Sequence, residues 1–264
     1  MKPLKLPYRI ALAGSLSAAA GGLALGAVVN TVRRTAGLAP LGPEWIAGMA
    51  ACSGSAFAVA YFPPYDCRRR TPGRVYLTFD DGPDPEVTPR ILDILTTRQG
   101  KATFFILGSS ALRCPDLIRR MFEEGHAIAI HGYDHSPVTF LPPGAICESL
   151  ARSAAAVRRA VAEARLDLYR PTYGLRGPGV EPAVQRLGMR TQLWTLDSRD
   201  YIFRSPQPIR QRLRDRLRSG DVVLMHDQGE AGAATASALP GILEDMALGG
   251  LTTASLDMAG TTIG

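Results

Sequence analysis

The sequence predicts an α/β fold, an incomplete (β/α) barrel with about seven parallel strands, preceded by one or two N-terminal transmembrane helices. From residue 75 onward, short apolar runs alternate with amphipathic segments, a pattern typical of a parallel sheet covered by helices. Seven strand candidates within about 190 residues fit a small incomplete barrel better than an open six-stranded sheet. Two uncharged apolar stretches precede this region and favour a membrane anchor.

The sequence of residues 1–65 predicts a membrane anchor. Residues 10–29 carry no charge and are long enough to cross a bilayer as a helix, with basic residues on both sides. Residues 45–62 form a second uncharged run with aromatic residues at its ends, as expected at a membrane interface. Two spans are the favoured reading, and one uncleaved anchor or a cleaved signal peptide are the alternatives.

A polar linker over residues 66–74 leads into a globular domain over residues 75–264. The strand candidates are short apolar runs at 75–79, 102–107, 127–131, 168–170, 191–196, 222–226 and 251–256. The helix candidates between them are amphipathic segments at 87–98, 115–124, 145–164, 181–187, 208–218 and 238–247.

The charge distribution points to a membrane and away from nucleic acid. The chain has a net charge of +6, but residues 1–74 carry +7 and the remainder carries −1. The basic excess therefore flanks the apolar stretches and forms no phosphate-binding patch on the domain. Four widely spaced cysteines without a CxxC pair predict neither a disulfide framework nor a cysteine zinc site.

The same charges bear on localisation. Three basic residues precede the first apolar run and four follow the second, whereas the loop between the two runs has two. Positively charged flanks favour the cytoplasm, so two spans predict a plasma-membrane protein with a cytoplasmic domain, by a small margin. A single anchor would reverse this orientation and place the domain outside.

Polar residues suited to catalysis follow the ends of five predicted strands. Since the carboxyl ends of parallel strands meet at one edge, we expect an active site there. In chain order these residues are Asp80 and Asp81 in TFDDGPD, His131 and His135 in HGYDH, Arg170, Asp197 and Asp200 in DSRDY, and His226 in LMHD.

The spacing of His131 and His135 suggests a metal centre. Two imidazoles and one carboxylate would supply three zinc ligands and leave a position for water. The same ligand set would also suit a ferrous oxygenase. The alternative to a metal centre is a pair of exposed loop histidines that bind nothing. His226 in an apolar strand and a spare carboxylate favour proton-transfer chemistry, with Arg170 paired to the free carboxylate.

The five ordered motifs TFDDGPD, HGYDH, RPTYG, DSRDY and LMHD resemble those of the polysaccharide deacetylase family, the NodB-homology domain of carbohydrate esterase family 4. The resemblance extends from about Val75 to Leu256. It implies a distorted (β/α) barrel, zinc or a similar divalent ion, and hydrolysis of N-acetyl groups on amino sugars. The substrate would be a polysaccharide or a glycolipid.

The resemblance also implies a role for each residue: Asp81, His131 and His135 hold the metal. Asp80 is the base and is oriented by Arg170. His226 is the acid, tuned by Asp200 rather than Asp197, and the Tyr173 N–H helps to bind the oxyanion. Three positions depart from the family pattern, namely Gly132, Thr172 and Tyr201, and they bear on substrate fit. A deformylase or deacylase of a polyprenyl-linked amino sugar is the alternative function. A non-catalytic sugar-binding protein is less favoured, since acid, base and ligands are all present.

Overall fold

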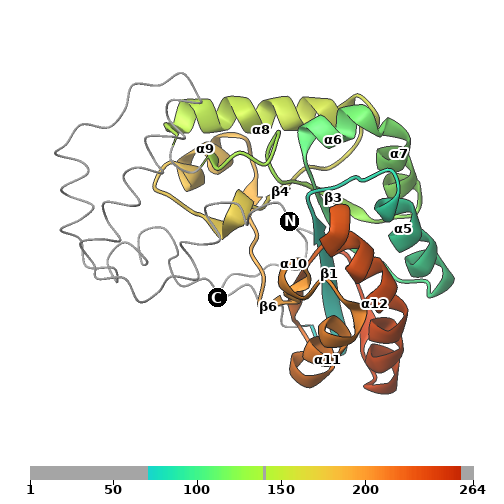
Figure 1. Ribbon diagram of the computed structural model, residues 1–264. Helices are drawn as coiled ribbons and strands as arrows, with labels where there is room; N and C mark the ends of the chain where they lie inside the picture. Colours follow the sequence, from blue (N-terminus) through green and yellow to red (C-terminus); the bar gives the residue numbers. More distant parts are fainter. Residues whose placement is uncertain (1–70, 139–140, 257–264) are drawn as a thin grey trace, which may run out of the picture.

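The computed structural model describes residues 71–138 and 141–256, which form an incomplete barrel of parallel strands with helices on its outside (Figure 1). The two predicted spans, residues 10–29 and 45–62, lie outside the described residues. Within the described ranges, no helix is both long and apolar enough to cross a membrane.

The sheet has eight strands, and every strand pair in it is parallel. Seven of them run in the order β5-β4-β3-β2-β1-β7-β6, while the short β8 pairs with the beginning of β1. The predicted incomplete barrel of about seven parallel strands is thus confirmed. The strands are β1 (Arg74–Asp80), β2 (Thr103–Ile106), β3 (Ala127–Ile130), β4 (Leu168–Tyr169), β5 (Arg190–Thr191), β6 (Leu196–Asp197), β7 (Val222–His226) and β8 (Thr252–Thr253).

The strand predicted at 191–196 is two separate strands in the structure. The run overlaps the end of β5 and the start of β6, which lie at opposite ends of the sheet order, so the barrel is open between them. Gln192 still donates its N–H to the Tyr169 carbonyl at 2.8 Å, whereas Thr195 already donates to Val222 at 2.8 Å. The intervening residues therefore cross from one edge of the sheet to the other.

Helices cover the outside of the sheet (Figure 1). Their bounds are α5 (Val87–Thr97), α6 (Gly108–Arg113), α7 (Pro115–Glu123), α8 (Pro143–Arg158), α9 (Val180–Arg186), α10 (Asp200–Phe203), α11 (Pro206–Arg216) and α12 (Gly229–Leu248), with a 3₁₀ turn at Thr172–Gly174. The sequence did not predict the short α6 and α10, and α8 ends at Arg158 rather than at residue 164.

The start of α12 was predicted too late, at residue 238 instead of Gly229. Residues 229–238 are mostly small, so they carry no apolar periodicity to indicate a helix. Small residues are needed there because the helix packs closely on the end of β7. A Cβ added at Gly232 would lie 2.7 Å from the Asp227 carbonyl carbon.

The core lies between the sheet and its helices and fixes the strand ends. The apolar side chains of β1 and β2 are fully buried, among them Leu77, Phe79 and Phe104. The rings of Phe79 and Phe104 stack with centroids 5.1 Å apart. Because each such side chain contributes about 1.5–3 kcal/mol on burial, the central strands form a rigid base for the residues that follow them.

Candidate active site

The carboxyl ends of β1, β3, β4, β6 and β7 lie at one edge of the barrel, and the residues that follow them meet there. The pairing register brings Asp80 at the end of β1 opposite His226 at the end of β7. The structure gathers the polar residues singled out from the sequence at this edge, namely Asp80, Asp81, His131, His135, Arg170, Tyr173, Asp200 and His226.

Asp81, His131 and His135 form a cluster with metal-binding geometry. One ligand atom from each lies within 4.8 Å of the other two. The Asp81 Oδ1 atom is 3.0 Å from His135 Nε2 and 3.3 Å from His131 Nε2. Asp81 and His135 both have a positive φ, of 79° and 64°, so the HGYDH segment is a loop as expected and the backbone is strained where it presents these side chains.

The tautomer of His131 suits a metal ligand. Its Nδ1 lies 2.7 Å from the carbonyl oxygen of Arg170, which can only accept a hydrogen bond. The Nδ1–H therefore donates to that carbonyl, and the Nε2 lone pair is left facing Asp81. The side chain is 3% exposed, so this orientation is fixed by the protein rather than by water.

The electrostatics of the cluster also fit a cation. Asp81 Oδ1 is buried and no hydrogen bond of regular geometry reaches it from the described residues. Burial alone would raise the pKa of Asp81, but His131 and His135 outweigh it and hold that pKa well below the usual range. Burial would lower the pKa of His131, and Asp80 and then Asp81 raise it instead. The carboxylates of Asp80 and Asp81 thus favour a positive charge between Asp81 and the two imidazoles, and a bound divalent ion would supply that charge.

Arg170 holds Asp80 in place. Its Nη1 donates to Asp80 Oδ1 at 2.7 Å and to the Thr78 hydroxyl at 2.8 Å. The rest of the guanidinium donates to the carbonyls of Gln192 and Leu193, both at 3.0 Å. The side chain is fully buried, so its charge must be compensated by protein groups such as these rather than by water. Asp80 consequently has one oxygen held by Arg170, while the other faces the candidate metal ligands and lies 3.8 Å from His131 Nε2.

His226 is paired with Asp200 and not with Asp197. Asp200 Oδ1 lies 2.8 Å from His226 Nδ1, and Oδ2 accepts the His226 N–H at 2.7 Å. Burial would lower the pKa of His226, but Asp200 outweighs it and, with smaller effects from Asp81 and Asp80, raises the pKa to about 10. Asp197 is occupied elsewhere, since it accepts the Arg199 N–H and the hydroxyl of Tyr201.

Tyr173 lies on the 3₁₀ turn that follows Arg170. It has a positive φ of 62°, and its ring meets the His135 ring edge-on with centroids 4.6 Å apart. The turn thereby brings the Tyr173 side chain against His135, one of the three candidate metal ligands.

Two supporting residues were not predicted. Thr235 on α12 donates its hydroxyl to Asp200 Oδ2 at 2.7 Å. Thr88 on α5 donates to Asp227 Oδ2 at 2.7 Å, and Asp227 in turn donates its N–H to the Asp80 carbonyl at 3.2 Å. A threonine within a helix carries no sequence signal of such a role, because only the packing of the helix against the strand ends creates it.

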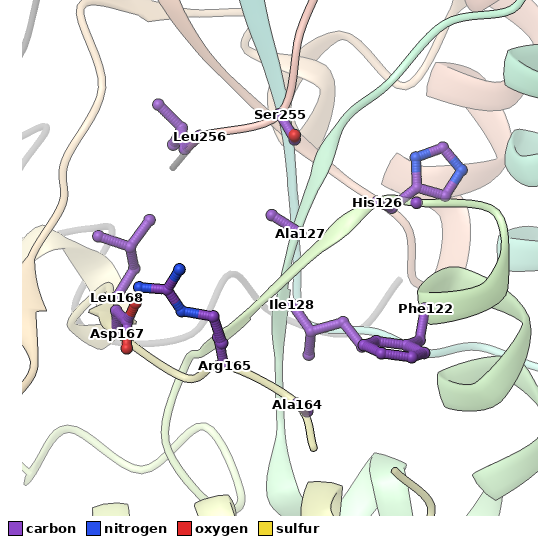
Figure 2. A pocket seen from close by; sticks show the side chains of 11 residues that line it. Phe122, His126, Ala127, Ile128, Ala164, Arg165, Asp167, Leu168, Ser255 and Leu256 are labelled. Atoms are coloured by element: carbon purple, nitrogen blue, oxygen red, sulfur yellow. Dashed lines mark hydrogen bonds and ion pairs between the residues drawn. The ribbon is translucent and has the colours of Figure 1, made fainter. Parts of the chain in front are cut away.

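A separate pocket lies at the opposite edge of the sheet, at the beginnings of β3 and β4 (Figure 2). Its lining is largely apolar, with His126 and Phe122 on one side and Arg165 and Asp167 on the other. None of the active-site residues named above lines this pocket.

Comparison with known proteins agrees with this geometry. Residues 68–192 match the family model described as polysaccharide deacetylase. A chitooligosaccharide deacetylase of Bradyrhizobium sp. (strain ANU 289) is 35% identical over 153 residues, which cover 58% of this chain and 70% of that enzyme. The chain belongs to the polysaccharide deacetylase family. It is therefore an enzyme, a hydrolase of carbon–nitrogen amide bonds.

Further members share the sequence and the fold. A peptidoglycan-N-acetylglucosamine deacetylase of Listeria monocytogenes is 33% identical over 168 residues, and the matched part covers 64% of this chain but only 35% of that enzyme. Among solved structures, a family 4 carbohydrate esterase from Streptomyces lividans in complex with acetate is 31% identical. It superposes with a TM-score of 0.66 over 73% of this chain and 97% of that one. The predicted family and the predicted class of enzyme are both confirmed.

Proposed function

We propose that this polysaccharide deacetylase family member is a zinc-dependent enzyme that removes the N-acetyl group from N-acetylglucosamine units of a glycan or glycolipid. The observation that carries the proposal is a three-ligand cluster and an Asp200–His226 pair on either side of Asp80. Two relatives named for deacetylation of chitooligosaccharides and of peptidoglycan support the amino sugar as substrate.

Asp81, His131 and His135 would hold the ion, a set that leaves room for water and substrate. When bound, a divalent ion supplies Lewis-acid polarisation of the acyl oxygen and lowers the pKa of the attacking water. Asp80 takes the proton of that water, and Arg170 keeps its carboxylate turned toward the cluster. A backbone N–H of the Tyr173 turn donates to the negative charge that develops on the acyl oxygen.

His226 completes the reaction as the acid. The new carbon–oxygen bond is retained only if the carbon–nitrogen bond breaks, and an amine leaves readily only after its nitrogen is protonated. With a pKa of about 10, His226 carries a proton at neutral pH that it can give to that nitrogen. Asp200 holds Nδ1 and thus directs Nε2 into the site. The products are acetate and a free amino sugar.

The residue roles are tested by separating metal content from turnover. Zinc bound to the purified full chain is measured by mass spectrometry, and acetate release from chitooligosaccharide is measured in parallel. H131A and D81N are expected to lose zinc and activity together. D80N and H226A are expected to keep zinc and lose about 10²–10⁴-fold in turnover. If D80N lost the zinc while D81N kept it, the roles of the two aspartates would have to be exchanged.

We further propose that residues 1–65 anchor the enzyme in the plasma membrane, with the catalytic domain on the cytoplasmic side. The uncharged runs at 10–29 and 45–62 and the positive charge at their outer flanks support this. An alkaline phosphatase fused after Gly264 reports the side directly, because it is active only outside the cytoplasm. An inactive fusion is expected, and strong phosphatase activity would contradict the two-span orientation.

A further inference from the structure

One turn of helix beside the active site exposes two large apolar side chains. In α10, Ile202 is 49% exposed and Phe203 is 37% exposed. The other exposed large hydrophobic residues of the described chain stand singly in the sequence, whereas these two are neighbours. Single exposed apolar residues are ordinary, but an adjacent pair beside a catalytic site marks a surface that contacts something less polar than water.

Positive charge surrounds this pair. Arg199 precedes α10 and Arg204 follows it, both exposed. Among the described residues Arg199 has no ion-pair partner, and Arg204 pairs with Glu230 at 2.6 Å in an exposed position where such a pair contributes little. Burial and then the like charges of Arg199 and Arg216 lower the pKa of the neighbouring Arg212, so the cations are close enough to repel one another. Arg199, Ile202, Phe203 and Arg204 are called the α10 rim below.

The α10 rim lies directly beside the acid of the reaction. Asp200, the first residue of α10, binds His226 through both of its oxygens. The ring of Tyr201 meets the His226 ring edge-on, with centroids 5.6 Å apart. Arg199 and Arg204 both adopt the left-handed conformation, with φ of 58° and 48°, and so confine α10 to a single turn at this place. Whatever covers the rim is therefore within one helical turn of the catalytic pair.

We propose that the α10 rim docks on the anionic surface of a lipid bilayer and thereby presents the active site to an amino sugar carried on a membrane lipid. This inference rests on the function proposed above and narrows its substrate class to lipid-linked amino sugars. Apolar side chains flanked by arginines suit the boundary between acyl chains and anionic headgroups. A neutral N-acetylated glycan offers no negative charge to pair with these arginines, whereas the phosphates of a lipid surface do. The uncharged runs at 10–29 and 45–62 would keep a bilayer within reach.

Contact is tested by hydrogen–deuterium exchange of the full chain on vesicles. The vesicles contain phosphatidylglycerol and phosphatidylcholine in equal parts, and vesicles of phosphatidylcholine alone serve as the neutral comparison. Amides of residues 199–204 are expected to exchange more slowly on the anionic vesicles only. R199E and the double variant I202S/F203S should lose this protection. R98E and L248S are matched controls, because Arg98 directly follows α5 and Leu248 ends α12, both are exposed, and neither belongs to the rim.

Turnover then separates the two proposals. On anionic vesicles, R199E is expected to slow acetate release from N-acetylglucosamine joined to a polyprenyl diphosphate by about tenfold, and to change release from soluble chitooligosaccharide by less than about twofold. Equal protection on both kinds of vesicle, or protection by chitooligosaccharide without vesicles, would overturn membrane docking. A parent enzyme that releases no acetate from either substrate would refute the proposed function, while the exchange result would still decide on docking.

Discussion

The pairing of His226 with Asp200 makes Asp200→Asn the most informative single change. Asp200 accepts four hydrogen bonds, from Nδ1 and the N–H of His226, from Thr235, and from the N–H of Tyr201. Asparagine keeps the size of the side chain but removes its charge and places two N–H donors where acceptors are needed. His226 is then left without the negative charge that outweighs its burial.

The expected loss can be worked from the pKa of His226. At about pH 7.5 and with a pKa of about 10, nearly every His226 is protonated. With an ordinary pKa of 6.5, roughly a tenth would be protonated at that pH, and burial would lower the fraction further. The protonation state alone thus costs at least about tenfold in turnover, and misorientation of the ring adds to this, up to the 10²–10⁴-fold typical of a lost general acid.

The assay is the pH dependence of kcat for acetate release from chitooligosaccharide. An acid must be protonated to act, so activity is lost as pH rises through its pKa, and Asp200→Asn should move this alkaline limb to lower pH. Thr235→Val is the matched control, because it removes one hydrogen bond to Asp200 and leaves the charge in place. Its alkaline limb should stay close to that of the parent. An Asp200→Asn enzyme that kept both its turnover and its alkaline limb would refute the role of His226 as acid.

Three other changes test the scaffold around the site. Arg170→Lys cannot reproduce the planar set of hydrogen bonds of the buried guanidinium, so urea unfolding should give a free energy of unfolding lower by about 3 kcal/mol, with turnover at least about tenfold down. Gly82→Ala would place a Cβ 2.1 Å from an Asp227 oxygen and should cost activity and about 1–3 kcal/mol of stability, whereas Gly144→Ala, with open space around it, should do neither. Burial lowers the pKa of His126 to about 4, so its unfolded form takes up a proton between about pH 6.5 and 4. The free energy of unfolding should therefore fall by up to about 3 kcal/mol as pH drops through this window, and urea titrations of His126→Gln should lack that component.

The sequence predicts the outline of the site because the polar residues of the site come at the ends of apolar segments that are recognisable as strands. In parallel β-structure the residues at and just past the end of a buried strand stand at the catalytic edge, so the sequence places Asp80 at the end of β1 and His226 at the end of β7 in one site. The choice between Asp197 and Asp200 could not be made from strand ends alone. It depends on the single turn of α10, which begins after a left-handed Arg199 and places the second aspartate, not the first, under His226.

The backbone carbonyls that bind Arg170 could not be predicted from the sequence either. Arg170 was predicted to meet a carboxylate, and it does, but most of its guanidinium is held by the carbonyls of Gln192 and Leu193. Those carbonyls are available because the strand predicted at 191–196 ends early at Thr191 and the chain crosses the open side of the barrel. A continuous strand would have used the same carbonyls in its ladder. The failed strand prediction and the unforeseen binding of Arg170 thus have one physical cause.

The strand order explains why two consecutive aspartates end β1. On one side of β1 lie β2, β3 and β4, which supply His131 and Arg170; on the other lie β7 and β6, which supply His226 and lead to Asp200. The Arg170 carbonyl fixes His131 while its guanidinium fixes Asp80, so one residue aligns the candidate metal ligands with the proposed base. The proposed acid, His226, is aligned independently by Asp200. Only the end of the central strand touches both halves, and there Asp81 can turn to the imidazoles while Asp80 stays between them and His226. The proposed mechanism, in which a water is activated on one side of Asp80 and an amine is protonated on the other, requires this arrangement.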